Sequence, residues 1–256
     1  MVGTLLKEWR QRRHLSQLDL ASMAGVSTRH LSFIETGRSR PSREMVLHLA
    51  DELDVPLRDR NPLLIAAGHA PAYGHTDLDA AAMKPVRDAL DRVLQSHRPY
   101  PALVVNRLWE LVAANEGVWS LLVGVADHLI APPVNVLRVS LHPDGLAPNI
   151  VNFHEWSAHL LHRLRRQFAL TRDADVGALY DELRSYPNVA TDDEHVESED
   201  AGALAVPFVL RVGDAELRFL STVTTFGTAV DITLAELSIE AFLPADDATA
   251  AALTRG

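Results

Sequence analysis

Apolar positions recur with helical spacing through the first seventy residues of the chain. Leu5, Leu6 and Trp9 share one face of an expected helix, and Ser16 and Ser27 each precede a further helical run. Gly25 stands between these two runs, where the chain needs a left-handed backbone. The pattern predicts an all-α domain of five helices, around residues 5–9, 16–24, 27–35, 42–53 and 61–68.

Alternating and continuous apolar runs appear only later in the chain. We expect strands at 102–106, 109–115, 205–212, 215–225 and 232–243, and helices at 79–96, 118–125, 149–170 and 175–185. Residues 134–141 form a short helix or strand, and the acidic run 191–200 is expected to be a solvated loop. Two strands, several helices and three more strands predict an α+β domain with an antiparallel five-stranded sheet in the PAS-like order.

Charge divides the chain in the same place as the periodicity. Its 256 residues carry a net charge of −10, which argues at first against a nucleic-acid partner. Residues 1–43, however, hold eight basic and three acidic side chains, a balance of +5, and the remainder holds 16 basic and 31 acidic ones, −15. Such asymmetry favours a part that faces nucleic acid joined to a part that does not.

Composition excludes several other classes of protein. The absence of cysteine excludes disulfides, thiolate metal sites and a cysteine nucleophile. The start of the chain lacks the apolar core of a signal peptide, and the apolar stretch 118–136 is broken by Asp127 and by Pro132 and Pro133. We therefore expect a cytoplasmic protein without a membrane partner.

The most specific motif is the spacing within residues 17–34. Counted from Gln17, the small Ala21 stands where two helices would nearly touch, and Gly25 stands at the turn between them. Val26, Leu31 and Ile34 follow at positions that pack the second helix on the first. The residues Gln17-x-x-Leu20-Ala21-x-x-Ala24-Gly25-Val26-Ser27 and Leu31-Ser32-x-Ile34-Glu35-x-Gly37-x-x-x-Pro41 resemble the phage-repressor (XRE, Cro/C1-type) helix–turn–helix family.

This resemblance implies that the helix starting at Ser27 lies in the major groove of double-stranded DNA. Arg29 is the foremost base reader, because a guanidinium can bond guanine O6 and N7 together. The basic residues that follow this helix are placed for phosphates. The expected DNA-binding residues are Gln17, Ser27, Thr28, Arg29, His30, Ser32, Arg38, Arg40 and Arg43. Arg13 is a further candidate for a phosphate contact. For Arg12, Arg13 and Arg43 the alternative is ordinary surface charge. For Glu35 and Arg40 the alternative is a structural role within the domain.

A second set of motifs lies in the remainder of the chain. It comprises Arg98-Pro99-x-Pro101-Ala102, Val105-Asn106-Arg107-x-Trp109, Leu137-Arg138-x-x-Leu141-x-Pro143-x-Gly145, Asn152-x-x-Glu155-Trp156, Thr224-Thr225-Phe226-Gly227-Thr228 and Ile239-Glu240-x-Phe242-x-Pro244-Ala245-Asp246. These residues resemble the MmyB-like regulator family. The resemblance implies a homodimeric transcription regulator with a PAS-like sensor domain that takes a fatty-acid-like or other apolar small molecule. The expected domains are a helix–turn–helix domain at 1–72, a linker and helix at 73–98 and a sensor at 99–256.

Aromatic and embedded polar residues are the candidates for the ligand pocket. Aromatic side chains supply apolar walls, and an embedded arginine or amide can meet a carboxylate. Core packing and structural salt bridges are the alternatives for the same residues. The candidates are Arg107, Trp109, Trp119, Arg138, Asn152, Trp156, Phe208, Phe219 and Phe226.

Other functions remain as alternatives. An enzyme acting on a small molecule in the C-terminal domain is the runner-up, with a haem sensor and a protein-interaction adaptor behind it. The cluster of His154, Glu155, His159 and His162 fails the zinc-protease spacing because Ala158 stands where the second histidine is needed. No phosphate-binding loop and no nucleophile elbow are present. We expect no metal site, no catalytic residue and no cofactor beyond the apolar ligand.

Overall fold

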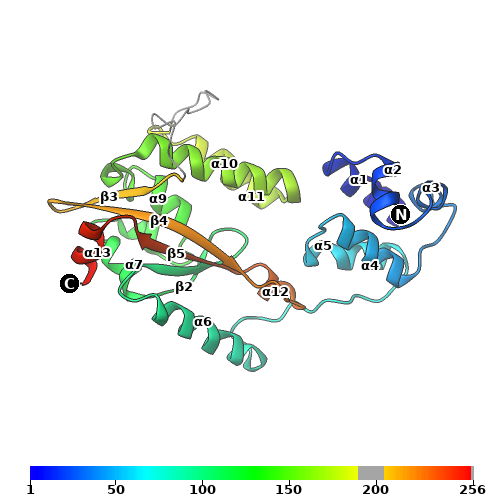
Figure 1. The fold of residues 1–256 in the computed structure, drawn as a ribbon, viewed down its shortest axis with the longest axis horizontal. Helices are drawn as coiled ribbons and strands as arrows, with labels where there is room; N and C mark the ends of the chain where they lie inside the picture. The colour runs from blue at the N-terminus through cyan, green and yellow to red at the C-terminus, as the bar shows by residue number, and fades with distance from the viewer. Residues whose placement is uncertain (190–204, 255–256) are drawn as a thin grey trace. The chain divides into compact units, whose positions relative to one another are not determined.

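The computed structural model describes residues 1–189 and 205–254, so the predicted acidic loop 191–200 lies outside the described residues. The chain forms two compact units, the first made mainly of Met1–Thr76 and the second mainly of Asp77–Phe168, Arg172–Gly227 and Glu236–Gly256 (Figure 1). The expected fold class is confirmed: a helical N-terminal region precedes a domain with an antiparallel five-stranded sheet and helices.

Five helices build the first unit: α1 (Val2–Arg12), α2 (Gln17–Met23), α3 (Thr28–Glu35), α4 (Arg43–Glu52) and α5 (Leu57–Ala66). Serine side chains begin three of them, since Ser16, Ser27 and Ser42 each accept a hydrogen bond from a backbone N–H of the first turn. Gly25 has a φ of +62°, which confirms the left-handed turn expected between α2 and α3. Helix α5 begins earlier than the predicted residue 61, because Pro56 supplies its N-cap.

Close packing holds α1 against α3. Leu6, Leu20 and Leu31 are fully buried in the core of this unit. A Cβ at Gly3 would lie 2.3 Å from the carbonyl oxygen of Ile34, so only glycine fits at this point of α1. The first helix therefore supports the end of α3 at backbone distance.

A buried ion pair joins the same two helices. Arg10 Nε donates to Glu35 Oε1 at 2.7 Å, and Arg10 Nη2 donates to Glu35 Oε2 at 2.9 Å. Gln17 Nε2 also donates to Glu35 Oε2, at 2.7 Å. Burial alone would raise the pKa of Glu35, but the hydrogen bonds from Arg10 and Gln17 and the positive charge of Arg10 together lower it. This network ties α1, the start of α2 and the end of α3 into one arrangement.

The second unit contains the sheet and the remaining helices. Its strands are β1 (Ala102–Val105), β2 (Leu111–Ala114), β3 (Phe208–Val212), β4 (Ala215–Thr225) and β5 (Ser238–Pro244). Its helices of more than one turn are α6 (Lys84–Ser96), α7 (Glu116–Leu121), α9 (Val136–Leu141), α10 (Phe153–Thr171), α11 (Ala174–Arg184) and α13 (Asp247–Thr254). The single-turn helix α8 (Asp127–Ile130) lies between α7 and α9 in the sequence. Within the predicted helix or strand 134–141, Val136–Leu141 form a helix, α9.

Two expectations about strands need correction. The predicted strand 232–243 starts with a single-turn helix, α12 (Ile232–Ala235), and β5 begins only at Ser238. The predicted strand 109–115 is shorter, because Trp109 has a positive φ of 64° and belongs to the turn between β1 and β2. Both errors arose because apolar residues at turns extend the hydrophobic run beyond the strand.

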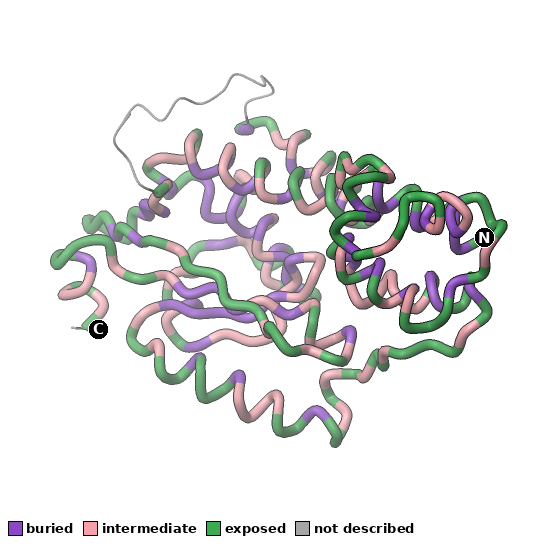
Figure 2. The backbone as a smooth tube through the Cα atoms, turned by 45° about the vertical axis from the view of Figure 1, so that its right-hand side comes forward, coloured by how far each residue is buried: buried purple, intermediate pink, exposed green. Residues whose placement is uncertain are grey.

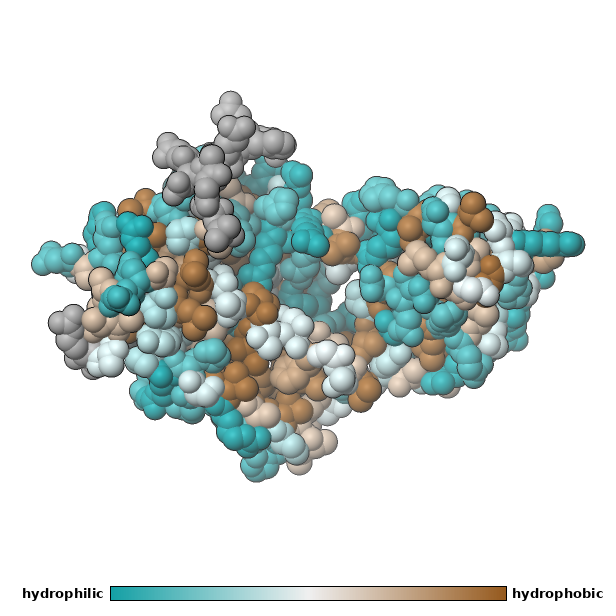
Figure 3. Space-filling model, viewed as in Figure 1, coloured by the Kyte–Doolittle hydropathy of each residue, from teal (hydrophilic) through white to brown (hydrophobic). Residues whose placement is uncertain are grey.

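The sheet has the order β2-β1-β5-β4-β3, with every neighbouring pair antiparallel. Central strand β5 pairs Glu240 with Leu103 on β1 and with Val223 on β4, so these side chains share one face. Helix α6 packs against β1, whose four residues are all buried. Figure 2 shows the buried residues concentrated along the strands and on one side of the long helices, and Figure 3 shows hydrophobic residues at the surface near α6.

Prediction for the buried pair. Replacing Arg10 by Met should destabilise the first unit by about 3 kcal/mol, because Glu35 keeps its charge and loses its main partner. Hydrogen exchange of the full chain would show lost protection in peptides from α1 to α5. Arg43→Met, at an exposed position, is the matched control and should change stability by less than about 0.5 kcal/mol. Equal protection in both variants would contradict this role of the pair.

Prediction for its pH dependence. The pKa of Glu35 is lower in the folded chain than its ordinary value of 4.5. The stability that Glu35 contributes is therefore present above pH 4.5 and is lost as the pH falls through the lower folded value. The difference in exchange protection between the wild type and Glu35→Gln should shrink on acidification below pH 4.5. A difference that grows there would refute the assignment.

Candidate functional site

Helix α3 presents a polar, cationic face. Thr28 and Arg29 are exposed at its start, and His30 and Ser32 are half-buried on the following turn. Arg38 and Arg43 are exposed beyond its end. Thr28, Arg29, His30 and Ser32 lie on the second helix of the helix–turn–helix, and the contacts of all six side chains with DNA stay predictions.

An aromatic ring that the sequence analysis missed organises this face. The guanidinium of Arg29 lies over the ring of Phe33 at 5.3 Å, and that of Arg38 lies over the same ring at 5.9 Å. Phe33 is half-buried on α3, one turn after Arg29. The spacing of four residues between Arg29 and Phe33 is the signal that predicts such a contact on a helix. Stacking limits the conformations of Arg29 before any DNA is bound.

Other candidates for DNA binding make contacts within their own unit. Arg40 Nε donates to the carbonyl of Ala67 at 2.9 Å, and Ser27 accepts from the backbone N–H of His30 at 3.1 Å. Gln17 is engaged by Glu35, as described above. Arg13 Nε donates to the carbonyl of Leu53 at 2.8 Å. These contacts give the four residues structural roles, and their contacts with DNA stay predictions.

The second unit contains an apolar cavity of about 80 Å³, partly open to solvent, between the sheet and the helices. Most of its wall is aliphatic or aromatic, and the polar side chains in it are Ser140 and Glu240. The lining residues are Pro101, Leu103, Leu111, Val118, Leu121, Leu122, Val134, Val136, Leu137, Val139, Ser140, Leu146, Trp156, Leu160, Phe208, Glu240 and Phe242.

Two of the predicted ligand residues line this cavity. Trp156 on α10 and Phe208 on β3 have ring centroids 4.9 Å apart. The indole Nε1 of Trp156 donates to Ser140 Oγ at 3.0 Å, which fixes both side chains. Phe219 is fully buried and packs behind Phe208, with ring centroids 6.0 Å apart, so it supports the wall without forming it.

The predicted polar residues are paired elsewhere in the unit. Arg107 forms an ion pair with Asp173, and Arg138 donates to both oxygens of Glu182 at 2.7 Å. Asn152 donates to the carbonyl of Pro207 at 2.8 Å and accepts from the N–H of Val209. These pairs link neighbouring elements, which is the structural alternative that the sequence left open.

The remaining aromatic candidates also lie away from the lining. Trp109 donates its indole N–H to Gln167 at 2.9 Å. Trp119 has 49% of its surface exposed, and Phe226 is half-buried in the loop after β4. For Trp119 the reason is the direction of its side chain. It follows the lining residue Val118 on α7, and successive residues of a helix point to different sides.

Glu240, the charged group of the cavity, is not among the ligand residues predicted from the sequence. Glu240 is 5% exposed, and Arg163 Nη1 on α10 donates to its Oε1 at 3.0 Å. Burial raises the pKa of Glu240, and the charge and hydrogen bond of Arg163, with a hydrogen bond from Ser221, offset this only in part. The guanidinium of Arg163 in turn lies 4.3 Å from the ring centre of Trp109. An acidic residue within the otherwise apolar segment 239–243 is the sequence signal for such a group.

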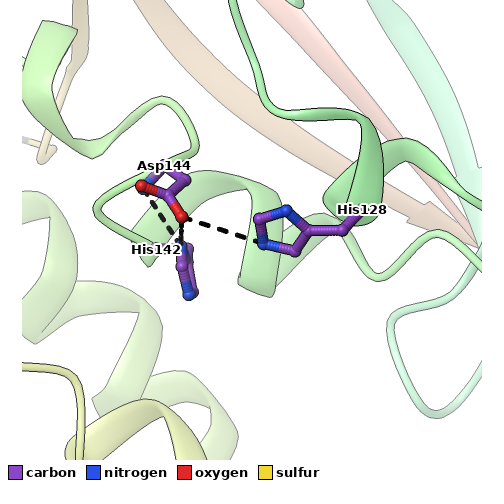
Figure 4. Close-up of side chains that lie close together, drawn as sticks. All are labelled: His128, His142 and Asp144. Atoms are coloured by element: carbon purple, nitrogen blue, oxygen red, sulfur yellow. Dashed lines mark hydrogen bonds and ion pairs between the residues drawn. The ribbon is translucent and has the colours of Figure 1, made fainter.

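A group of histidines and an aspartate lies outside the cavity. His128 on α8 and His142 and Asp144 after α9 bring their side chains together (Figure 4). Asp144 Oδ2 lies 4.0 Å from His128 Nε2 and 3.8 Å from His142 Nδ1. However, His142 Nδ1 already accepts the backbone N–H of Asp144 at 3.0 Å, so a metal ion there would compete with this hydrogen bond. The histidines singled out from the sequence are on α10, where His159 stacks on Trp156 at 5.6 Å.

Comparison with known proteins assigns the chain to a family. Residues 86–255 match the MmyB-like transcription regulator ligand binding domain, and residues 6–59 match a helix–turn–helix family. The chain therefore belongs to the MmyB-like transcription regulators, and the resemblance read from the sequence is confirmed. None of the helices described is long and apolar enough to cross a membrane.

Two individual proteins are similar to part of the chain. The ImmF control region 10 kDa protein of Bacillus phage phi105 is 36% identical over 56 residues, which are 22% of this chain. The match spans 62% of that relative's length. The chain is also similar to a solved SinR protein/SinI protein complex, with 30% identity over 37% of this chain and 82% of that one and a TM-score of 0.24.

Prediction for the arginines. Arg29→Ala should weaken binding to a selected DNA site by about 1–3 kcal/mol and leave thermal stability nearly unchanged, because Arg29 is exposed and stacks on Phe33 at the surface. Arg40→Ala should instead lower the stability of the first unit by about 1 kcal/mol, because it removes the hydrogen bonds to Ala67 and Gly68. Fluorescence anisotropy with labelled DNA and thermal melting separate the two effects. Undiminished specific binding by Arg29→Ala would show that Arg29 is not a base reader.

Proposed function

We propose that this protein is a sequence-specific transcription regulator whose DNA binding is controlled by a small apolar ligand in the second unit. One observation carries the proposal: a single chain joins a helix–turn–helix with an exposed cationic α3 to a ligand-binding domain that contains an apolar cavity. The acidic remainder of the chain would limit non-specific contact with DNA.

The surface of α3 supports the DNA half of the proposal. Arg29 would read bases, with Thr28, His30 and Ser32 beside it, and Arg38 and Arg43 would contact phosphates. One recognition helix reads only a few base pairs, so we infer that the protein binds as a homodimer on two half-sites about 34–36 Å apart.

The cavity supports the ligand half of the proposal. Its wall suits an alkyl or acyl chain such as that of a fatty-acid-like molecule, because burial of apolar surface is the main interaction it offers. A ligand that binds two conformations of the domain with different affinity would shift the population of the DNA-binding state.

We favour ligand binding over catalysis in this cavity. Ser140 is the hydroxyl group in its lining, and its oxygen already accepts the indole N–H of Trp156. Among the described residues that line the cavity there is no histidine to activate Ser140 as a nucleophile. The chemistry of the wall thus fits a sensor better than an enzyme.

Prediction for ligand control. DNA sites are first selected from random duplexes with the full chain, and affinity for the selected site is then measured with and without 1-octanol or octanoate. At least one probe should change the DNA affinity of the wild type by about fivefold or more. Val118→Phe should abolish this response, because the larger side chain fills part of the cavity of about 80 Å³.

Trp119→Phe is the matched control on the same helix. Trp119 is exposed and lies outside the lining, so this variant should respond as the wild type does. A wild type whose DNA affinity no probe alters, or a Val118→Phe variant that responds fully, would refute control through this cavity.

A further inference from the structure

Glu240 lies at the centre of the sheet and faces the cavity. Its strand β5 is the middle strand of the order β2-β1-β5-β4-β3. Its direct neighbours across the sheet are Leu103 and Val223, both apolar, and the next lining residue on its own strand is Phe242. A carboxyl group among such neighbours gains nothing from packing, so its presence there needs a partner.

Arg163 and the hydroxyl of Ser221 are both partners of Glu240, and together they offset the cost of its burial only in part. Arg163 reaches Glu240 Oε1 from α10, and its own side chain is 26% exposed against 6% for Glu240. Arg163 is not part of the cavity lining, whereas Glu240 is. The pair is neutral as a whole, but the carboxyl is the group that a molecule in the cavity would meet.

The composition of the wall decides which ligand this carboxyl suits. Among the described residues that line the cavity there is no lysine, arginine or histidine. A ligand carboxylate would therefore add an uncompensated negative charge next to Glu240, at high cost in an apolar site. A hydroxyl or amide N–H would instead donate to Glu240 and add no charge.

We propose that Glu240 is the polar anchor of the cavity and that it selects neutral apolar ligands with a hydrogen-bond donor, such as an alcohol or amide, over carboxylates of the same chain length. This inference rests on the proposed function, since it takes the cavity to be the ligand site. The raised pKa of Glu240 agrees with it, because the site already disfavours one negative charge.

The test compares two probes of equal length. Isothermal titration of the full chain with 1-octanol and with octanoate at pH 7.5 should give at least about tenfold tighter binding of the alcohol. Glu240→Gln should keep binding of the alcohol within a fewfold and tighten binding of octanoate by about tenfold, because the variant leaves the positive charge of Arg163 uncompensated. Thermal melting of the variant checks that it is folded.

The outcomes separate this inference from the proposed function. Octanoate binding as tightly as 1-octanol to the wild type overturns the role of Glu240, whatever the variant does. The role of Glu240 is also overturned if Glu240→Gln leaves the ratio of the affinities for 1-octanol and octanoate unchanged. If neither probe binds, or if Val118→Phe does not weaken binding, the cavity is not the ligand site and the proposed function fails first.

Discussion

The buried carboxylate of Glu35 is the constraint on which the DNA-reading unit depends. Glu35 ends α3, and a charge in that position is tolerated only because Arg10 and Gln17 donate three hydrogen bonds to it. These donors come from α1 and α2, so satisfying the charge also sets how the recognition helix lies against its supports. The close approach of Gly3 to Ile34 allows α1 to come near enough for Arg10 to reach. The exposed face with Arg29 and Phe33 is thus held by interactions on the opposite side of the same helix.

Glu240 in the second unit is also a buried carboxyl group paired with an arginine, but there the cost of burial outweighs the effect of its partners. Both carboxyls are buried, and each has an arginine and a second polar side chain as partners. Glu35 has a bidentate ion pair with Arg10 and the amide of Gln17. Glu240 has a single hydrogen bond of 3.0 Å from the more exposed Arg163 and the hydroxyl of Ser221. The pKa of Glu35 is accordingly lowered and that of Glu240 is raised. A buried carboxylate whose charge is fully compensated stabilises the fold. One whose charge is compensated only in part can still be stabilised by a hydrogen bond from a ligand.

The sequence predicted the first unit better than the cavity, and the reason is physical. The helix–turn–helix depends on local rules: serine caps, a glycine at the turn and apolar residues at fixed spacing all act within one or two turns. The antiparallel five-stranded sheet was also predicted, because two strands, several helices and three further strands follow one another along the chain, but the neighbours within the sheet come from the structure. The cavity depends on which face each side chain takes and on pairing between distant strands, so Trp156 and Phe208 were found whereas Trp119 was misplaced. Arg107 and Arg138 were singled out as polar residues within apolar segments, but both side chains are partly exposed, and only the fold reveals their partners Asp173 and Glu182.

The size of the cavity bears on how a ligand can control DNA binding. Pockets for typical small-molecule ligands measure about 300–1,000 Å³, well above the cavity of about 80 Å³ in this unit. A ligand with a long alkyl chain must therefore displace part of the wall, and α7 is a short helix that contributes Val118 and Leu121 to it. Such a displacement means that the liganded and unliganded domains differ in structure. That difference is what coupling requires, because a ligand that binds two states equally cannot shift the balance between them.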